Sequence, residues 1–252
     1  MKQIELESRR IPLLAFIPNL ITLFGLCLGL VALRYALTGR PELAIVLLLF
    51  AMLADTADGR AARLLGSESE FGAALDTLSD FFNFGVVPAV LLYQNLFFGS
   101  EVERVGWCAL AFYCACCAMR LARFTATTGD EGANGSLCFL GVPAPALCCL
   151  VLLPMFVRLS GYEQITGYLV ISYVAGVGFL AISRLRTPSI KSPILPRTFV
   201  PVSMVMAAAF VICLTVFPWP SLIVADLIYI ASLPYAHSAF GNGTSPEGGR
   251  QK

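Results

Sequence analysis

The sequence predicts an all-α, polytopic transmembrane helical bundle of about eight spans, with both termini in the cytoplasm. Composition is the first reason, because 58% of the 252 residues are hydrophobic and only 13% are charged. A soluble domain carries about 25% charged residues. The second reason is a series of apolar runs close to the length of about 20 residues that crosses a bilayer. The third is the uneven distribution of lysine and arginine between alternate loops.

The apolar runs and the breaks between them define the expected spans. Polar or turn-forming stretches such as Gly99–Glu103 and Pro218–Pro220 separate one run from the next. The predicted spans are 11–38, 43–64, 72–98, 105–127, 142–159, 165–183, 199–217 and 219–236. We expect 11–236 to form one transmembrane domain, preceded by a cytoplasmic interfacial lead-in over 1–10. Residues 237–252 are rich in Ser, Gly, Asn and Pro and predict a disordered cytoplasmic tail.

The basic residues predict the orientation, because cytoplasmic loops are enriched in lysine and arginine. With eight spans, one side of the membrane collects most of the 17 basic residues, and the other has only Arg34, Arg40, Arg104 and Arg158. Both termini lie on the rich side. We therefore expect a multi-pass protein of the cell membrane with cytoplasmic ends. The net charge of +1 gives no general attraction for nucleic acid, so no such partner is expected.

Four aspartates lie where the second and third apolar runs meet: Asp55, Asp58, Asp76 and Asp80. Spacings of three and four residues place each pair on one face of its helix. The connection Gly66–Phe71 is short, so the two helices are expected to be antiparallel neighbours, with Ser69 capping the second. The two pairs can then converge just inside the cytoplasmic boundary.

Converging carboxylates repel one another unless cations lie between them. Mg²⁺ and Mn²⁺ prefer oxygen ligands, and two such ions about 3.5–4 Å apart form the clamp of many phosphoryl-transfer sites. A salt-bridge network is the alternative, in which Arg60 and Arg63 neutralise two acids. Placing an acidic side chain within the membrane costs free energy, and such residues usually mark functional sites. The pattern therefore predicts two divalent cations, Mg²⁺ or Mn²⁺, held by the four aspartates.

The pattern Asp55-x-x-Asp58-Gly59-x-x-Ala62-Arg63, then eight residues, then Gly72-x-x-x-Asp76-x-x-x-Asp80 resembles the signature of the CDP-alcohol phosphatidyltransferases without a departure. Stretches 17–30, 69–93, 120–124, 141–146 and 183–192 are similar to the serine-using branch, so the resemblance covers about 10–195. It implies transfer of the phosphatidyl group from CDP-diacylglycerol to the L-serine hydroxyl, with release of CMP by direct attack. It also implies a homodimer and an active site that faces the cytoplasm.

The resemblance implies a role for each matching residue. Asp55, Asp58 and Asp76 would hold one metal ion, and Asp55, Asp76 and Asp80 the second. Asp80 would also be the base that takes the proton of the attacking hydroxyl. The residues implied for the CDP part of the donor are Gly59, Arg63, Ser69 and Gly72. Asn19 and Thr22 are candidates to border the nucleotide; ordinary polarity at a helix start is the alternative.

An L-serine pocket needs a cation for the carboxylate and acceptors for the ammonium group. Arg120 and Arg123 lie three residues apart near the cytoplasmic end of the fourth span and can each present a planar guanidinium. The alternative for both arginines is that they contact lipid headgroups or only contribute to the excess of basic residues on the cytoplasmic side. Asn83, one turn beyond Asp80, is a candidate for the ammonium, and interhelical packing would explain it equally well. No role is predicted for Asp226.

Other functions follow from other readings of the same residues. Sibling transferases use glycerol phosphate, inositol phosphate or choline, and a phosphorylated acceptor requires a denser basic pocket than the sequence indicates. A cation transporter would spread its ligands near the bilayer midplane over repeated broken helices, whereas these acids cluster at one boundary. A non-catalytic lipid-binding protein would not need four aspartates. The expected partners are CDP-diacylglycerol, L-serine and membrane lipids.

Overall fold

The structure, a computed structural model, describes residues 16–67, 69–128, 138–140, 142–162, 166–183, 186–188 and 200–241. The chain divides into two compact units, one ending at Asn83 and the other beginning at Phe84. The predicted lead-in over 1–10 and residues 242–252 of the predicted tail lie outside the described residues.

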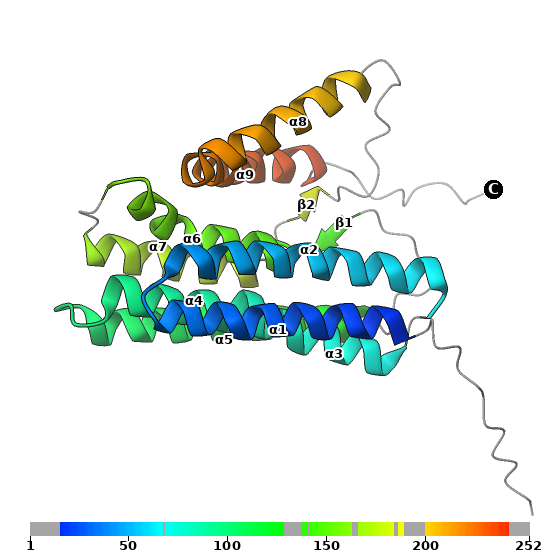
Figure 1. Ribbon diagram of the computed structural model, residues 1–252, viewed down its shortest axis with the longest axis horizontal. Coiled ribbons are helices and arrows are strands. Elements are labelled where there is room, and N and C mark those ends of the chain that lie inside the picture. Colours follow the sequence, from blue (N-terminus) through cyan, green and yellow to red (C-terminus); the bar gives the residue numbers. More distant parts are fainter. Residues whose placement is uncertain are drawn as a thin grey trace, which may run out of the picture. The chain divides into compact units, whose positions relative to one another are not determined.

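Three α-helices form the first unit: α1 (Ile17–Leu37), α2 (Pro41–Leu65) and α3 (Glu70–Asp80). α1 packs against both α2 and α3 (Figure 1). Gly66 ends α2 in the left-handed conformation, at φ 57°, which glycine adopts without steric cost. Ser69 then caps α3, because its hydroxyl oxygen accepts a hydrogen bond of 3.0 Å from the Gly72 amide. The predicted cap is confirmed.

The chain beyond α3 stays helical but changes its hydrogen-bonding pattern. A π-helical stretch, η2 (Phe81–Val86), follows Asp80 directly, and α4 (Val87–Leu92) and η3 (Tyr93–Phe97) come next. The sequence predicted one uninterrupted span over 72–98. The structure therefore confirms the helix and adds two π-helical stretches, which in proteins often occur at functional sites.

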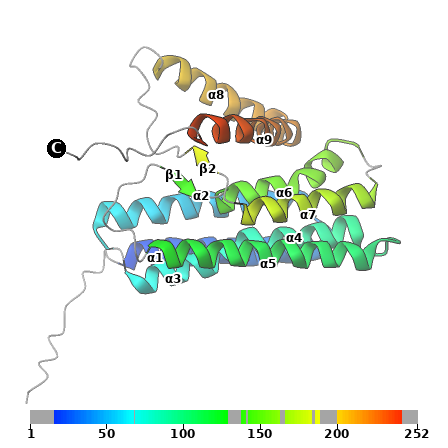
Figure 2. The same ribbon diagram turned by 180° about the vertical axis from the view of Figure 1, so that it is seen from behind.

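The second unit includes α4 and η3 and, among the described residues, five further helices: α5 (Glu103–Thr128), α6 (Ala144–Leu159), α7 (Gly167–Ile182), α8 (Val200–Val216) and α9 (Pro218–Gly241). α5 packs with α7, and α6 packs with α9 (Figure 2). Tyr113 on α5 is fully buried, and its hydroxyl donates a 2.8 Å hydrogen bond to the carbonyl of Phe84. α9 continues to Gly241, so the first residues of the predicted tail are helical.

A short strand pair is added to this helical architecture. β1 (Cys138–Leu140) and β2 (Arg186–Pro188) pair antiparallel, with Phe139 opposite Thr187. Three residues are too few to show an alternating pattern of apolar and polar side chains. The helical class is confirmed, and the sequence did not reveal this ladder.

Length and apolarity show which described helices suit a bilayer. Three are long and apolar enough to cross it: Ile17–Leu37, Glu70–Phe97 and Glu103–Ala126. The shorter apolar helices are Ala144–Leu159, Gly167–Ile182, Val202–Val216 and Pro218–Leu233. Many large apolar side chains are exposed, including Phe24, Leu53 and Phe179. Exposed apolar surface on this scale is not expected of a monomer in water, so this is a membrane protein.

Candidate active site

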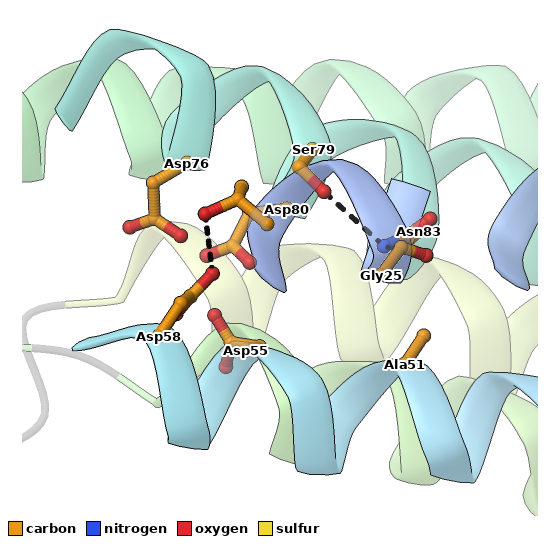
Figure 3. A pocket seen from close by; sticks show the side chains of 9 residues that line it. Gly25, Ala51, Asp55, Asp58, Asp76, Ser79, Asp80 and Asn83 are labelled. Atoms are coloured by element: carbon orange, nitrogen blue, oxygen red, sulfur yellow. Dashed lines mark hydrogen bonds between the residues drawn. The ribbon is translucent and has the colours of Figure 1, made fainter. Parts of the chain in front are cut away.

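The carboxylates of Asp55, Asp76 and Asp80 converge. Oxygen atoms from the three side chains all lie within 4.8 Å of one another, and each side chain is half-buried. Asp55 comes from α2, whereas Asp76 and Asp80 come from successive turns of α3. Figure 3 shows the three carboxylates pointing toward a common space. The predicted convergence of the two helices through their acids is confirmed for these three residues.

Asp58 borders the same space but is tied to a different helix. Its side chain is only 4% exposed. The hydroxyl of Thr22 on α1 donates a 2.6 Å hydrogen bond to Asp58 Oδ2 (dashed line at Asp58 in Figure 3). Hydrogen bonds to a charged acceptor are short and strong. α1 therefore fixes the orientation of this carboxylate.

The pocket between these helices is mostly polar. Its lining residues are Thr22, Gly25, Ala51, Asp55, Asp58, Asp76, Ser79, Asp80 and Asn83. No lysine or arginine is among these lining residues. Arg63 is instead exposed, and its Nε donates a 3.0 Å hydrogen bond to the backbone oxygen of Gly59 one turn earlier. The pocket geometry therefore gives no support to the salt-bridge alternative.

The donor set suits a metal ion. Three carboxylates within 4.8 Å of one another would repel strongly if all were ionised with nothing between them. Oxygen ligands from two rigid helices are what Mg²⁺, Mn²⁺ and similar hard cations bind. The cluster formed by Asp55, Asp76 and Asp80 can therefore hold a metal ion, and Asp58 lines the same pocket.

The residues implied for the nucleotide lie around the ends of α2 and α3. Gly59 faces open space, since no atom lies within 4 Å of where a β-carbon would be. A β-carbon on Gly72 would come within 2.9 Å of Asn19 Oδ1 and 3.1 Å of Ser69 Oγ. The structure thus gathers Asn19, Ser69 and Gly72 at the start of α3. Gly59 leaves room beside α2 for a bulky group.

The residues predicted for serine lie in different units. Asn83 is in the first unit and lines the aspartate pocket. Arg120 and Arg123 are on α5 in the second unit, where Arg123 Nη1 donates a 3.2 Å hydrogen bond to the Ile182 carbonyl. Asp226 is buried in α9, also in the second unit. The serine contacts of Asn83, Arg120 and Arg123 remain predictions.

Sequence reasoning missed the part played by α1. Thr22, Gly25 and Gly29 are spaced by three and four residues and share one face of α1, which meets Asp58 of α2 and Asn83 of η2. A β-carbon on Gly25 would lie 3.4 Å from Cβ of Ala54 on α2. Gly25 and Gly29 therefore allow close packing of α1 on other helices of the same subunit.

Comparison with known proteins is consistent with this site. The sequence model of the CDP-alcohol phosphatidyltransferase family matches residues 15–180. A CDP-diacylglycerol–serine O-phosphatidyltransferase of Mycobacterium leprae is 36% identical over 91% of this chain and 77% of its own length. The protein of that name in Mycobacterium tuberculosis H37Rv is 29% identical over 91% of this chain and 81% of its own. That of Helicobacter pylori 26695 is 33% identical over 71% and 74%.

Proposed function

Because the chain belongs to the CDP-alcohol phosphatidyltransferase family, we propose that it transfers the phosphatidyl group of CDP-diacylglycerol to the hydroxyl of L-serine. One observation carries the proposal: the acids of the family signature meet in a single pocket, with Asp55, Asp76 and Asp80 within 4.8 Å of one another. Relatives that resemble most of the chain are named for serine as the acceptor. The products would be phosphatidylserine and CMP.

The proposed reaction is one direct displacement at phosphorus. The serine oxygen forms a bond to the phosphorus that carries diacylglycerol, and the bond from that phosphorus to the CMP oxygen breaks. Asp80 accepts the proton of the serine hydroxyl, and CMP leaves with the bonding electron pair. Two bound divalent cations, Mg²⁺ or Mn²⁺, would offset the charge on the pyrophosphate oxygens and ease the departure of CMP.

The other motif residues would position the donor. Asp55, Asp58 and Asp76 would hold the first cation, and Asp55, Asp76 and Asp80 the second. Arg63 is exposed on the last turn of α2 and can swing its guanidinium toward a phosphate. Gly59, Ser69, Gly72, Asn19 and Thr22 would surround the rest of the CDP group. Holding the serine hydroxyl next to the donor phosphate would supply part of the rate enhancement.

We further propose eight spans over 11–236, with both termini and the active site facing the cytoplasm across the cell membrane. Residues 1–10 would lie at the interface, and the chain end within 237–252 would be a cytoplasmic tail. The charge distribution supports this orientation, since basic residues concentrate on one side. A homodimer is proposed from family resemblance alone.

An acceptor screen tests the proposal. The purified protein in detergent or vesicles is given CDP-diacylglycerol and Mn²⁺ or Mg²⁺, with L-serine, glycerol 3-phosphate, inositol phosphate or choline supplied separately. We expect CMP release and lipid product with L-serine alone. Product with another acceptor and none with serine would identify a sibling transferase. CMP release that is equal with and without any alcohol would contradict transferase function.

Arg120 and Arg123 can be assigned to one substrate or the other by steady-state kinetics. If their guanidinium groups bind the serine carboxylate, Arg120→Ala or Arg123→Ala should raise the KM for serine about tenfold or more, equivalent to about 1.4 kcal/mol. The KM for CDP-diacylglycerol should change little. Arg104→Ala, a change at the other end of the same helix, is the matched control. A rise confined to the lipid KM would place these arginines at the donor.

A further inference from the structure

Asn83 is held in a space that only glycine leaves open. The side chain is 2% exposed at the start of η2. Its Nδ2 donates a 3.2 Å hydrogen bond to the carbonyl of Gly25 on α1 and lies 3.4 Å from Ser79 Oγ. A β-carbon on Gly29 would lie 1.9 Å from Asn83 Oδ1 and 2.9 Å from its Cγ. The amide therefore packs directly on the α1 backbone.

The orientation of this amide argues against a contact with the serine ammonium. Nδ2 is a donor and would repel an ammonium group, and Oδ1 is the only acceptor on the side chain. Oδ1 occupies the space where a β-carbon of Gly29 would stand, and it is buried without a hydrogen-bond partner among the described residues, so packing against α1 holds this end of the amide. The alternative noted from the sequence, interhelical packing, agrees with these contacts.

Asp80 lies close to the point where Asn83 attaches the chain to α1. It is the last residue of α3, and the π-helical stretch begins at the next residue. The hydrogen-bonding pattern of the helix changes directly after Asp80, and π-helical stretches often occur at functional sites. Asn83, three residues further on, joins this point to the Gly25 carbonyl. The same face of α1 holds Asp58 through Thr22.

We propose that Asn83 is a positioning residue for Asp80: its hydrogen bond to Gly25 and its fit against Gly29 hold the end of α3 against α1, so that Asp80 lies beside Asp55 of α2. α1 then acts as a template for both halves of the acidic cluster, through Thr22 for Asp58 and through Asn83 for Asp80. The inference rests on the proposed function for its catalytic consequence. The metal-binding consequence does not depend on which alcohol is the acceptor.

The test measures Mn²⁺ affinity in the absence of both substrates, by the electron paramagnetic resonance signal of free Mn²⁺. Gly29→Ala removes no polar group from the protein, but its β-carbon would displace the Asn83 amide from its position against α1. Changes in residues that orient metal ligands commonly cost about 10–100-fold in affinity, and we expect a loss in that range. The control is Gly176→Ala on α7, where a β-carbon meets no atom within 4 Å; its Mn²⁺ affinity should equal that of the wild type.

A double-mutant cycle separates the proposed contact from general damage. Asn83→Ala removes the amide and should itself weaken Mn²⁺ binding. In the Asn83→Ala background, Gly29→Ala no longer meets the amide, so it should cost less than threefold. Equal and independent losses at the two positions would overturn the proposal. So would unchanged Mn²⁺ affinity in Asn83→Ala accompanied by a raised KM for serine, which would make Asn83 a substrate contact.

The two proposals fail in different ways. If wild-type protein binds Mn²⁺ but makes no phosphatidylserine, the acceptor assignment is wrong and the cycle at Gly29 and Asn83 still decides the positioning role. Should Gly29→Ala fail to fold, the wild type and Asn83→Ala still compare the site with and without the amide. Circular dichroism and the thermal midpoint without metal verify that each variant is folded.

Discussion

Removing divalent cations should abolish turnover, and adding Mg²⁺ or Mn²⁺ should restore it. The carboxylates of Asp55, Asp76 and Asp80 lie within 4.8 Å of one another, and no basic residue is among the described residues that line their pocket. Without cations, this cluster would repel the pyrophosphate of the donor lipid. The measurement is phosphatidylserine formation after treatment with excess chelator and again after titration with each ion. Full turnover in excess chelator would overturn the metal hypothesis.

A second measurement ties the metal dependence to these residues. A ligand that binds only the folded state raises stability, by about 2.7 kcal/mol when its concentration is 100 times its dissociation constant. Mn²⁺ should therefore raise the thermal midpoint of the wild-type protein. Asp76→Asn removes one charge from the cluster and should reduce that rise. Asp226→Asn, a buried aspartate on α9 outside the signature, should leave the rise intact.

The helices and the acidic cluster were predictable from the sequence for physical reasons. An apolar run of bilayer length is a strong local signal, and each predicted range overlaps a described helix or a continuous series of helical elements. The convergence of Asp55, Asp76 and Asp80 followed from helical spacing together with the short connection between α2 and α3. Ser69 caps α3, as expected.

The role of α1 was harder to predict, because it depends on contacts between residues far apart in the sequence. Thr22 and Asp58 are separated by 36 positions, and Gly25 and Asn83 by 58. Spacing along one helix shows which residues share a face but does not reveal what that face meets. Thr22 was therefore predicted only as a nucleotide neighbour. Likewise, the π-helical stretch after Asp80 has no periodic signature in the sequence.

Asp80→Asn should reduce the rate of phosphoryl transfer far more than it reduces binding of the donor lipid. Asparagine keeps the shape of the side chain and one oxygen but does not accept the serine proton. A positioned general base contributes about 10²–10⁴-fold to a rate, so kcat should fall by at least that factor. CDP-diacylglycerol should still bind measurably, since Asp55, Asp58 and Asp76 retain their charges.

Asp58→Asn should reduce binding of the donor lipid more than it reduces the rate of phosphoryl transfer. The Asp58 oxygen that accepts the 2.6 Å hydrogen bond from Thr22 can be replaced by an amide oxygen, so the packing against α1 is retained while one negative charge is lost. Binding of the liponucleotide should weaken, and a higher concentration of Mn²⁺ should partly restore it. Asp80 remains able to accept the proton, so the single-turnover rate at saturating lipid and metal should fall less than in Asp80→Asn.

The comparison requires both quantities from both variants: the dissociation constant of CDP-diacylglycerol and the single-turnover rate with saturating serine. Asp226→Asn again controls for replacing a buried aspartate by its amide. If Asp80 is the base, the rate loss in Asp80→Asn persists at every Mn²⁺ concentration, because no cation replaces a missing proton acceptor. A near wild-type rate in Asp80→Asn would show that the proton goes elsewhere and that the displacement proposed for this pocket is wrong.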